Sequence, residues 1–189
     1  NRPLGLYLIC SGRVKIAKED SNGRSQIVRI VSAPNLLGDR AFFAEANYAS
    51  TGEVMEESQI CFLEAKQFWE LFGQDAGMLR LLTQRFATEL GEAEDHMRCI
   101  AGCQINRRMA THLLKSRSPV NSHRLPHNEV LLTESRTELA QLLATTPEAV
   151  SRALAHFCAK GLIAVEDRHV RILNEARLRL AACPHAPAQ

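Results

Sequence analysis

The first 65 residues alternate apolar and polar side chains in short runs, a pattern that predicts β-strands. The runs cover residues 6–18, 26–31, 51–54 and 59–63, and the first of them is interrupted at Gly12. The first two runs are separated by Asp-Ser-Asn-Gly, which predicts a hairpin turn because Asn and Gly tolerate positive φ angles. Several short strands at this spacing are typical of a β-sandwich or a jelly roll.

From residue 65 to about residue 116 the apolar period becomes three or four residues, which predicts helix. One apolar line is about 22 residues long and heptad-like, with charged residues on the other faces. Its members are Leu79, Leu82, Phe86, Leu90, Ala93, Met97 and Ile100. The length of this line favours a seam between two copies of the chain, and the alternative is a helix packed on its own domain. Residues 102–105 interrupt the line, so we place a hinge there.

After a polar loop at residues 116–128, the chain carries start and stop signals for two short helices. Ser135 and Glu138 have the spacing of a capping box at the start of the first helix. Thr146 is a good N-cap for the second helix, and Pro147 suits its first position. Gly161 supplies a left-handed residue at its end. Two helices joined by so tight a turn are typical of a helix-turn-helix, whose second helix enters the major groove of DNA.

The second of these helices carries polar side chains opposite its apolar stripe, and residues 163–172 behind it predict a β-hairpin wing. The polar residues are Glu148, Ser151 and Arg152. Arg pairs with guanine O6 and N7, Glu accepts a hydrogen bond from cytosine N4, and Ser contacts several base edges. The alternative is a solvated ion pair between Glu148 and Arg152, worth about 0.3 kcal/mol. The surrounding pattern favours contact with DNA bases.

Composition and charge support a folded chain in two parts of opposite charge. The 189 residues are 46% hydrophobic with a net charge of +2, which excludes a disordered chain. Residues 1–104 hold 11 Lys and Arg against 14 Asp and Glu, whereas residues 105–189 hold 12 against 7. The basic C-terminal part is therefore suited to a polyanion. No apolar run is long enough to span a membrane, and the scattered cysteines predict a reducing cytoplasmic setting.

Three segments resemble the Crp/Fnr family of bacterial transcription regulators: LYLICSGRVKI, LLGDRAFF, and TELAQLLATTPEAVSRAL followed by KGLI. The resemblance covers nearly the whole chain, and the last motif is the most specific. It implies an α+β fold with an N-terminal β-roll of the cyclic-nucleotide-binding kind, a long dimerisation helix and a C-terminal winged helix-turn-helix. We expect the β-roll sensor at residues 1–72, without its front part, the dimerisation helix and hinge at 73–104, and the DNA-binding domain at 105–189.

The resemblance also implies which groups contact DNA. It gives base contacts to the same three polar side chains of the second helix, and phosphate contacts to Arg136, Thr146 and the wing residue Arg168. Pro147 stands where the cyclic-AMP receptor type has an Arg, and Glu-x-x-Ser-Arg resembles the Fnr branch. We therefore expect a homodimer on palindromic double-stranded DNA with TTGAT-like half-sites, and RNA polymerase as a further partner.

The signal is less well determined by the sequence. Cyclic-nucleotide sensors carry Arg-Ser or Arg-Thr for the cyclic phosphate, whereas residues 48–51 here are Tyr-Ala-Ser-Thr. The long-helix positions that face the nucleotide in the cyclic-AMP receptor hold Ala93 and Glu94, and a carboxylate would repel a phosphate. We therefore do not expect cyclic AMP as the ligand.

Cysteines and one histidine leave an iron cofactor open. Cys61 matches the position of an internal cluster-ligating cysteine in the oxygen-sensing Fnr type, but the three closely spaced cysteines of that type do not occur in this chain. His96, Cys99 and Cys103 follow at one-turn spacings, as ligands of a haem or a metal would. The alternative is that all four are packing or surface residues, and the cofactor stays unknown.

The sequence therefore predicts a transcription regulator whose DNA affinity is controlled by a signal at the β-roll. The alternative function is a ligand-binding module that regulates a protein partner without binding DNA. An enzyme is not expected, because the chain has no Gly-rich phosphate loop, no HExxH and no nucleophile elbow.

Overall fold

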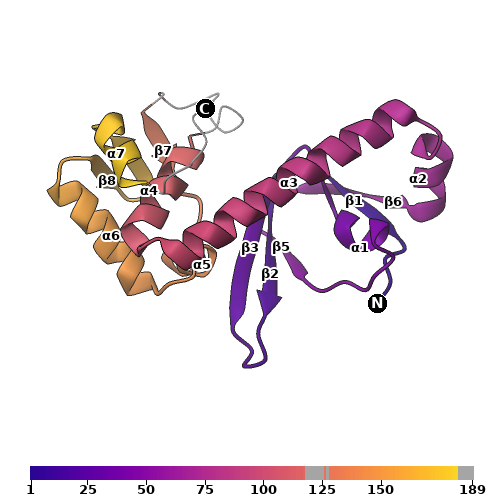
Figure 1. The fold of residues 1–189 in the computed structure, drawn as a ribbon, viewed down its shortest axis with the longest axis horizontal. Coiled ribbons are helices and arrows are strands. Elements are labelled where there is room, and N and C mark those ends of the chain that lie inside the picture. The colour runs from indigo at the N-terminus through magenta and orange to yellow at the C-terminus, as the bar shows by residue number, and fades with distance from the viewer. Residues whose placement is uncertain (118–125, 127, 183–189) are drawn as a thin grey trace. The chain divides into compact units, whose positions relative to one another are not determined.

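The computed structural model describes residues 1–117, 126 and 128–182 of the chain (Figure 1). The chain divides into two compact units, Asn1–Glu89 and Leu90–Gln189, which we call the N-terminal unit and the C-terminal unit. The division falls within the long helix α3 (Ala76–Gly102), so each unit contains a part of that helix.

The N-terminal unit contains two antiparallel three-stranded sheets (Figure 1). The strand order of the first sheet is β4 (Asn35–Leu37), β1 (Gly5–Ser11), β6 (Gln59–Glu64). The strand order of the second sheet is β3 (Ser25–Ser32), β2 (Arg13–Glu19), β5 (Thr51–Val54). The strand runs predicted from alternation are all confirmed, and Gly12, with a φ of 86°, separates β1 from β2. The predicted hairpin turn is also confirmed, because the Asp20 carboxylate accepts hydrogen bonds from the backbone N–H groups of Asn22 and Arg24.

The helical region consists of three helices, because two breaks divide it: α2 (Ala65–Phe72), α3, and α4 (Ile105–Lys115) in the C-terminal unit. The interruption predicted at 102–105 is confirmed. The break at residues 73–75 was not predicted, and Asp75 begins α3 there by accepting hydrogen bonds from the backbone N–H groups of Gly77 and Met78 at 2.8 and 3.0 Å. The sequence also gave no signal for β4 and the short helix α1 (Asp39–Phe43), which are only three and five residues long.

Apolar packing joins α1, α2 and α3 to the first sheet. Leu6, Phe42, Phe68 and Leu82 are buried together, and Phe43, Phe72 and Phe86 pack around them. The rings meet largely edge to face, for example Phe43 against Phe86 at 5.4 Å between centroids, the arrangement that aromatic quadrupoles favour. The beginning of α3 is therefore part of the core of the N-terminal unit.

An ion-pair network lies beside this core. Asp39, only 2% exposed, accepts a hydrogen bond from Arg85 of α3 at 2.6 Å. Arg29 of β3 is 3.8 Å from the same carboxylate, and Glu89 pairs with both arginines. Because a buried charge is costly unless it is paired, the two arginines are what allow Asp39 to lie inside the unit.

The C-terminal unit is a helical cluster closed by a small sheet. Its further elements are β7 (Glu129–Leu131), α5 (Arg136–Leu142), α6 (Pro147–Ala159), β8 (Ile163–Glu166), β9 (His169–Ile172) and α7 (Glu175–Ala181). The sheet has the order β7–β9–β8, and the predicted wing hairpin is confirmed with Asp167, at a φ of 54°, in its turn. The core includes Met109, Leu139 and Phe157. Most of the predicted loop at 116–128 lies outside the described residues.

Among the described residues, no helix combines the length and the apolar character needed to cross a membrane.

Replacing Arg85 with Gln should lower the free energy of unfolding of the N-terminal unit by about 3 kcal/mol, because the buried Asp39 loses its closest counterion. We place the loss at the lower end of the range for broken buried pairs because Arg85 is partly exposed. Urea unfolding followed by the fluorescence of Trp69, the single tryptophan, measures it. Arg80→Gln, an exposed site on the same helix, is the control and should change stability by less than about 0.5 kcal/mol. Equal losses in the two variants would contradict this role of Arg85.

Candidate DNA-binding interface

The turn between α5 and α6 is built by the capping groups expected from the sequence. At the start of α5, Ser135 Oγ accepts from the Glu138 backbone N–H at 3.2 Å, and the Glu138 carboxylate accepts from the Ser135 N–H at 2.8 Å. Thr146 Oγ1 accepts from the Ala149 N–H at 3.3 Å, and Pro147 is the first residue of α6. The predicted helix ends are confirmed, including Gly161, whose φ is 64°.

Arg108 of α4 fixes the end of α5 from outside the motif. Its guanidinium donates hydrogen bonds to the carbonyl oxygens of Leu143 and Ala144 at 2.6 and 3.2 Å. These carbonyls follow the last turn of α5, where backbone acceptors lack partners within the helix. Sequence reasoning missed Arg108, because the spacing of residues in α4 gives no sign that it reaches a turn 35 residues away.

One side of α6 is buried in the unit and the other carries the three polar side chains that we expected to contact bases. Val150, Ala153, Leu154 and Phe157 are buried, whereas Glu148, Ser151 and Arg152 are exposed. Because the buried side fixes the helix, these three side chains project from a rigid support. They lie within the first two turns of α6, the part of a recognition helix that contacts base edges.

The three exposed side chains differ in the hydrogen bonds that they already form within the protein. The Ser151 hydroxyl donates to the Pro147 carbonyl at 3.0 Å, so its oxygen is left as an acceptor. Hydrogen bonds from the backbone N–H of Glu148 and from the Thr146 hydroxyl hold the pKa of Glu148 below its usual value. In the described part of the chain no ion pair joins Glu148 to Arg152 within 4.0 Å, although the positive charge of Arg152 also contributes to lowering the pKa of Glu148.

The residues expected to contact phosphates come from three segments of the same unit. Arg136 is the first residue of α5 and is partly exposed, and Thr146 is the exposed N-cap of α6. Arg168 is exposed in the wing turn, and its backbone carbonyl accepts a hydrogen bond from the Leu132 N–H at 2.8 Å. The fold of the C-terminal unit therefore fixes the backbone positions of all three residues.

The expected dimer seam divides into residues used inside the N-terminal unit and residues that remain accessible. Leu82 is buried and Phe86 is partly buried in the aromatic core described above, so they contribute to that core. Leu79, Leu90, Ala93 and Met97 are exposed, and Ile100 is partly buried. Leu79, Leu90 and Met97 are 11 and 7 residues apart, close to three and two helical turns, so they share one side of α3.

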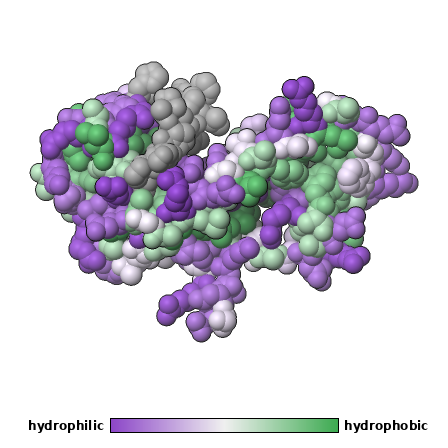
Figure 2. All heavy atoms as spheres, viewed as in Figure 1, coloured by the Kyte–Doolittle hydropathy of each residue, from purple (hydrophilic) through white to green (hydrophobic). Residues whose placement is uncertain are grey.

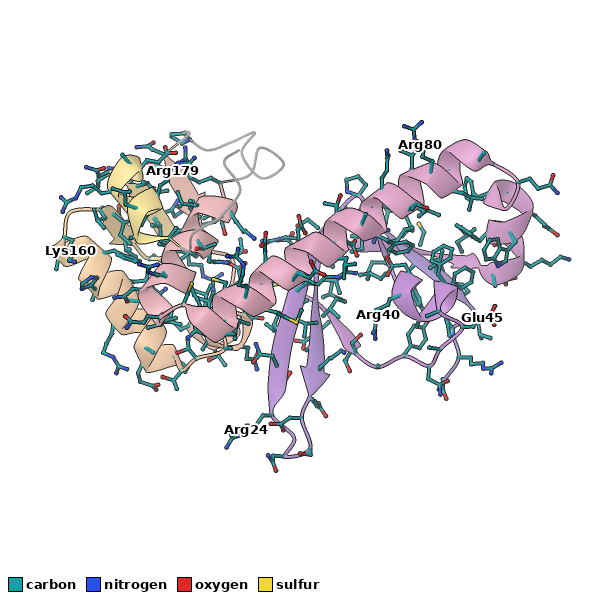
Figure 3. All side chains as sticks on the ribbon, viewed as in Figure 1. Arg24, Arg40, Glu45, Arg80, Lys160 and Arg179 are labelled. Atoms are coloured by element: carbon teal, nitrogen blue, oxygen red, sulfur yellow. The ribbon has the colours of Figure 1, made fainter. Side chains whose placement is uncertain are left out.

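Around the expected sensor site, Asp39 is already engaged by arginines of the protein itself. Arg40, the next residue, is exposed and projects outward from α1 (Figure 3). Tyr48 lies against the backbone at Gly38, where a Cβ would be 3.3 Å from its ring. Hydrophobic surface is visible over the part of this unit that holds β1, β6 and α2 (Figure 2). Leu8 of β1, Phe62 of β6 and Trp69 of α2 are exposed.

The four candidate metal ligands come from both units: Cys61 belongs to the N-terminal unit, and the other three belong to the C-terminal unit. Cys61 lies on β6, where its sulfur is 3.4 Å from the sulfur of Cys10, while the other three candidates lie on or just after α3. Burial and the positive charges of Lys115 and Arg108 lower the pKa of His96, Cys99 is disulfide-bonded, and Cys103 is partly buried. The described residues contain no group of three or more His, Cys, Asp or Glu side chains that could hold a metal ion.

Two family models match the chain, one in each unit. A cyclic nucleotide-binding domain matches residues 1–75, and a Crp-like helix-turn-helix domain matches residues 107–181. The second match contains α5, the turn, α6 and the wing.

Individual proteins agree with these matches. The probable transcriptional regulator flp of Lacticaseibacillus casei is 28% identical over 170 residues, which are 89% of this chain and 75% of that protein. The fumarate and nitrate reduction regulatory protein of Vibrio cholerae is 23% identical over 173 residues, which are 92% of this chain and 69% of that protein. The structure of FixK2 from Bradyrhizobium japonicum matches with a TM-score of 0.82 at 24% identity and covers 96% of this chain and 89% of its own.

The expected fold class is thereby confirmed: an N-terminal β-sheet unit like a cyclic-nucleotide-binding domain, a long helix and a C-terminal helix-turn-helix. The related proteins are transcriptional regulators and not enzymes. The two matched domains, their order along the chain and these relatives together identify the chain as a member of the Crp/Fnr family of transcription regulators.

Proposed function

We propose that the chain is a sequence-specific, dimeric DNA-binding regulator whose affinity for DNA is controlled by a signal at the N-terminal unit. The observation that carries the proposal is the exposed group of Glu148, Ser151 and Arg152 on the first two turns of a helix whose other side is buried. Each of these side chains can pair with base edges in the major groove. The positive end of the helix dipole at the N-terminus of α6 also favours the approach of a phosphate.

Charge and the segments around α6 support binding to the DNA backbone. The C-terminal residues 105–189 carry the excess of Lys and Arg noted above, which suits a polyanion. Arg136, Thr146 and Arg168 would position α6 by contacting phosphates, which set register but carry no sequence information. Arg108 would act indirectly, because it keeps the turn before α6 in place.

The accessible side of α3 supports a homodimer. Leu90 and Met97 are 61% and 62% exposed and lie seven residues apart, so they form an apolar stripe on one side of α3 that a partner could cover. A second copy of α3 would bury both copies of these residues, and dimers are typical of the family. Two copies of α6 would then meet two half-sites of a palindrome about one helical turn apart.

Within this proposal, residues 1–72 are the sensor domain, 73–104 the dimerisation helix and hinge, and 105–189 the DNA-binding domain. The Asp39–Arg85 pair connects α1 directly to α3, so a signal that changed the surroundings of Asp39 would reach the dimerisation helix through one contact. The lack of a cation at residues 48–51 argues against cyclic AMP. RNA polymerase is the protein partner that a regulator of this kind would contact.

A selection of binding sites from random DNA should return palindromes with TTGAT-like half-sites. The reason is that α6 carries Glu-x-x-Ser-Arg and has Pro147 directly before Glu148, where the cyclic-AMP receptor type has an Arg. Sequencing the bound pool of the purified full chain measures this directly. TGTGA half-sites would contradict the assignment. If the chain bound no DNA at low salt, where phosphate contacts are strongest, it would instead be a module that regulates a protein partner.

Replacing Arg152 with Ala should cost about 1–3 kcal/mol in discrimination at one base pair, because a bidentate contact to guanine would be lost. Fluorescence anisotropy with the selected site and its single-base variants measures the effect. Lys160→Ala is the matched control: it removes the same charge at the far end of α6, where Lys160 projects outward (Figure 3). The control should weaken all sequences alike, and an Arg152→Ala protein with unchanged discrimination would refute the contact.

Replacing Leu90 with Glu should raise the dimer dissociation constant by about 100-fold or more, because two buried leucines are lost per dimer at roughly 1.5 kcal/mol each, before the added charges are considered. Sedimentation equilibrium measures the constant. Leu81→Glu is the control, since Leu81 is also 61% exposed but lies on another side of α3. Equal changes in the two variants would show that this side of α3 is not the interface.

A further inference from the structure

Cys10 and Cys61 form a close pair of thiols on adjacent strands of the first sheet. Their sulfur atoms are 3.4 Å apart, and the Cys10 S–H donates to Cys61 Sγ. Both residues are exposed and neither is disulfide-bonded. A disulfide has an S–S length of about 2.05 Å, so the two sulfurs need to approach by only about 1.4 Å, which side-chain rotation can supply.

The pairing of β1 with β6 explains why the two thiols meet. Leu8 lies opposite Cys61 and Ile9 opposite Ile60, but the register then shifts, so that Ser11 lies opposite Gln59. Cys10 is the residue in the irregularity and has no partner across the ladder. A bulge of this kind redirects a side chain, and here it brings Cys10 beside a cysteine 51 positions along the chain.

We propose that Cys10 and Cys61 are a redox modification site that forms an intramolecular disulfide by exchange with a small-molecule disulfide such as glutathione disulfide. In the first step one cysteine thiolate attacks a sulfur of glutathione disulfide, a mixed disulfide forms, and one glutathione leaves as the thiolate. In the second step the other cysteine thiolate attacks the protein sulfur of the mixed disulfide and expels the second glutathione. The protein loses two electrons and two protons, and glutathione disulfide becomes two glutathione thiols.

The neighbouring thiol makes the second step fast. The first step should accelerate as the pH rises, since the thiolate is the nucleophile. Once a mixed disulfide exists, the second sulfur is already within 3.4 Å of the one it attacks, so closure is intramolecular.

The disulfide would act on the strand that leads into the helices. β6 ends at Glu64 and α2 begins at the next residue, without a linker. A covalent bond from β1 to β6 would hold this strand to the sheet that carries Leu6 of the aromatic core. The site does not depend on DNA binding, and its chemistry can be tested by itself.

The test uses the full chain, first reduced with dithiothreitol and then held in glutathione buffers of increasing disulfide content. After alkylation and tryptic digestion, the expected product is a disulfide between the peptide that ends at Arg13 and the peptide of residues 41–66. Cys10→Ser and Cys61→Ser should each abolish this product and leave a glutathione adduct on the remaining cysteine. Cys158→Ser, which removes another exposed free thiol, should leave the product unchanged.

A measurement without variants guards against substitutions that disturb folding. Phenylarsine oxide bridges two neighbouring thiols, so a small excess should protect both Cys10 and Cys61 of the reduced protein from alkylation, while Cys158 stays reactive. Separate glutathione adducts on Cys10 and Cys61 without the linked peptide would overturn the proposal. The proposal would also be overturned if Cys10 and Cys61 stayed reduced in buffers in which Cys158 is modified. Independent alkylation of Cys10 and Cys61 in the presence of the arsenical would overturn it as well.

Discussion

The carboxylate of Asp39 is the constraint on which the arrangement of the N-terminal unit depends. It is the single buried acidic side chain among the described residues, and its counterions come from two other elements, Arg85 of α3 and Arg29 of β3. A buried carboxylate without these partners would be strongly destabilising, so α1, β3 and the start of α3 must keep their relative positions. The aromatic core beside it adds apolar burial between α1 and α3.

A comparable long-range contact organises the C-terminal unit. Arg108 of α4 bonds to the carbonyls at the end of α5, and this contact holds the turn from which α6 begins. The direction of α6 therefore depends on a residue outside the helix-turn-helix itself. This explains how the three exposed polar residues are presented from fixed positions, since the buried stripe of α6 and the capped turn leave the helix little freedom.

Much of the fold could be predicted from local patterns. The strand runs, the Asp-Ser-Asn-Gly turn, the capping box at Ser135 and the N-cap at Thr146 all act within a few residues, and all occur in the structure. The elements that were not predicted are short. β4 is held by pairing with β1, and α1 by burial of Ala41 and Phe42, so their residues carry no periodic signal long enough to recognise.

By itself, the sequence determined the order of the elements, the helix ends around the turn and the polar side of α6, because period, capping and turn chemistry are local properties. Only the tertiary structure decided which apolar residues of α3 serve its own unit, that Arg85 neutralises Asp39, that Arg108 holds the turn, and that Cys10 meets Cys61. Each of these contacts joins residues from different elements, and in the case of Cys10 a shift of register decides the contact. The physical reason is that a side chain's neighbours across elements are set by packing and strand register, which no single segment encodes.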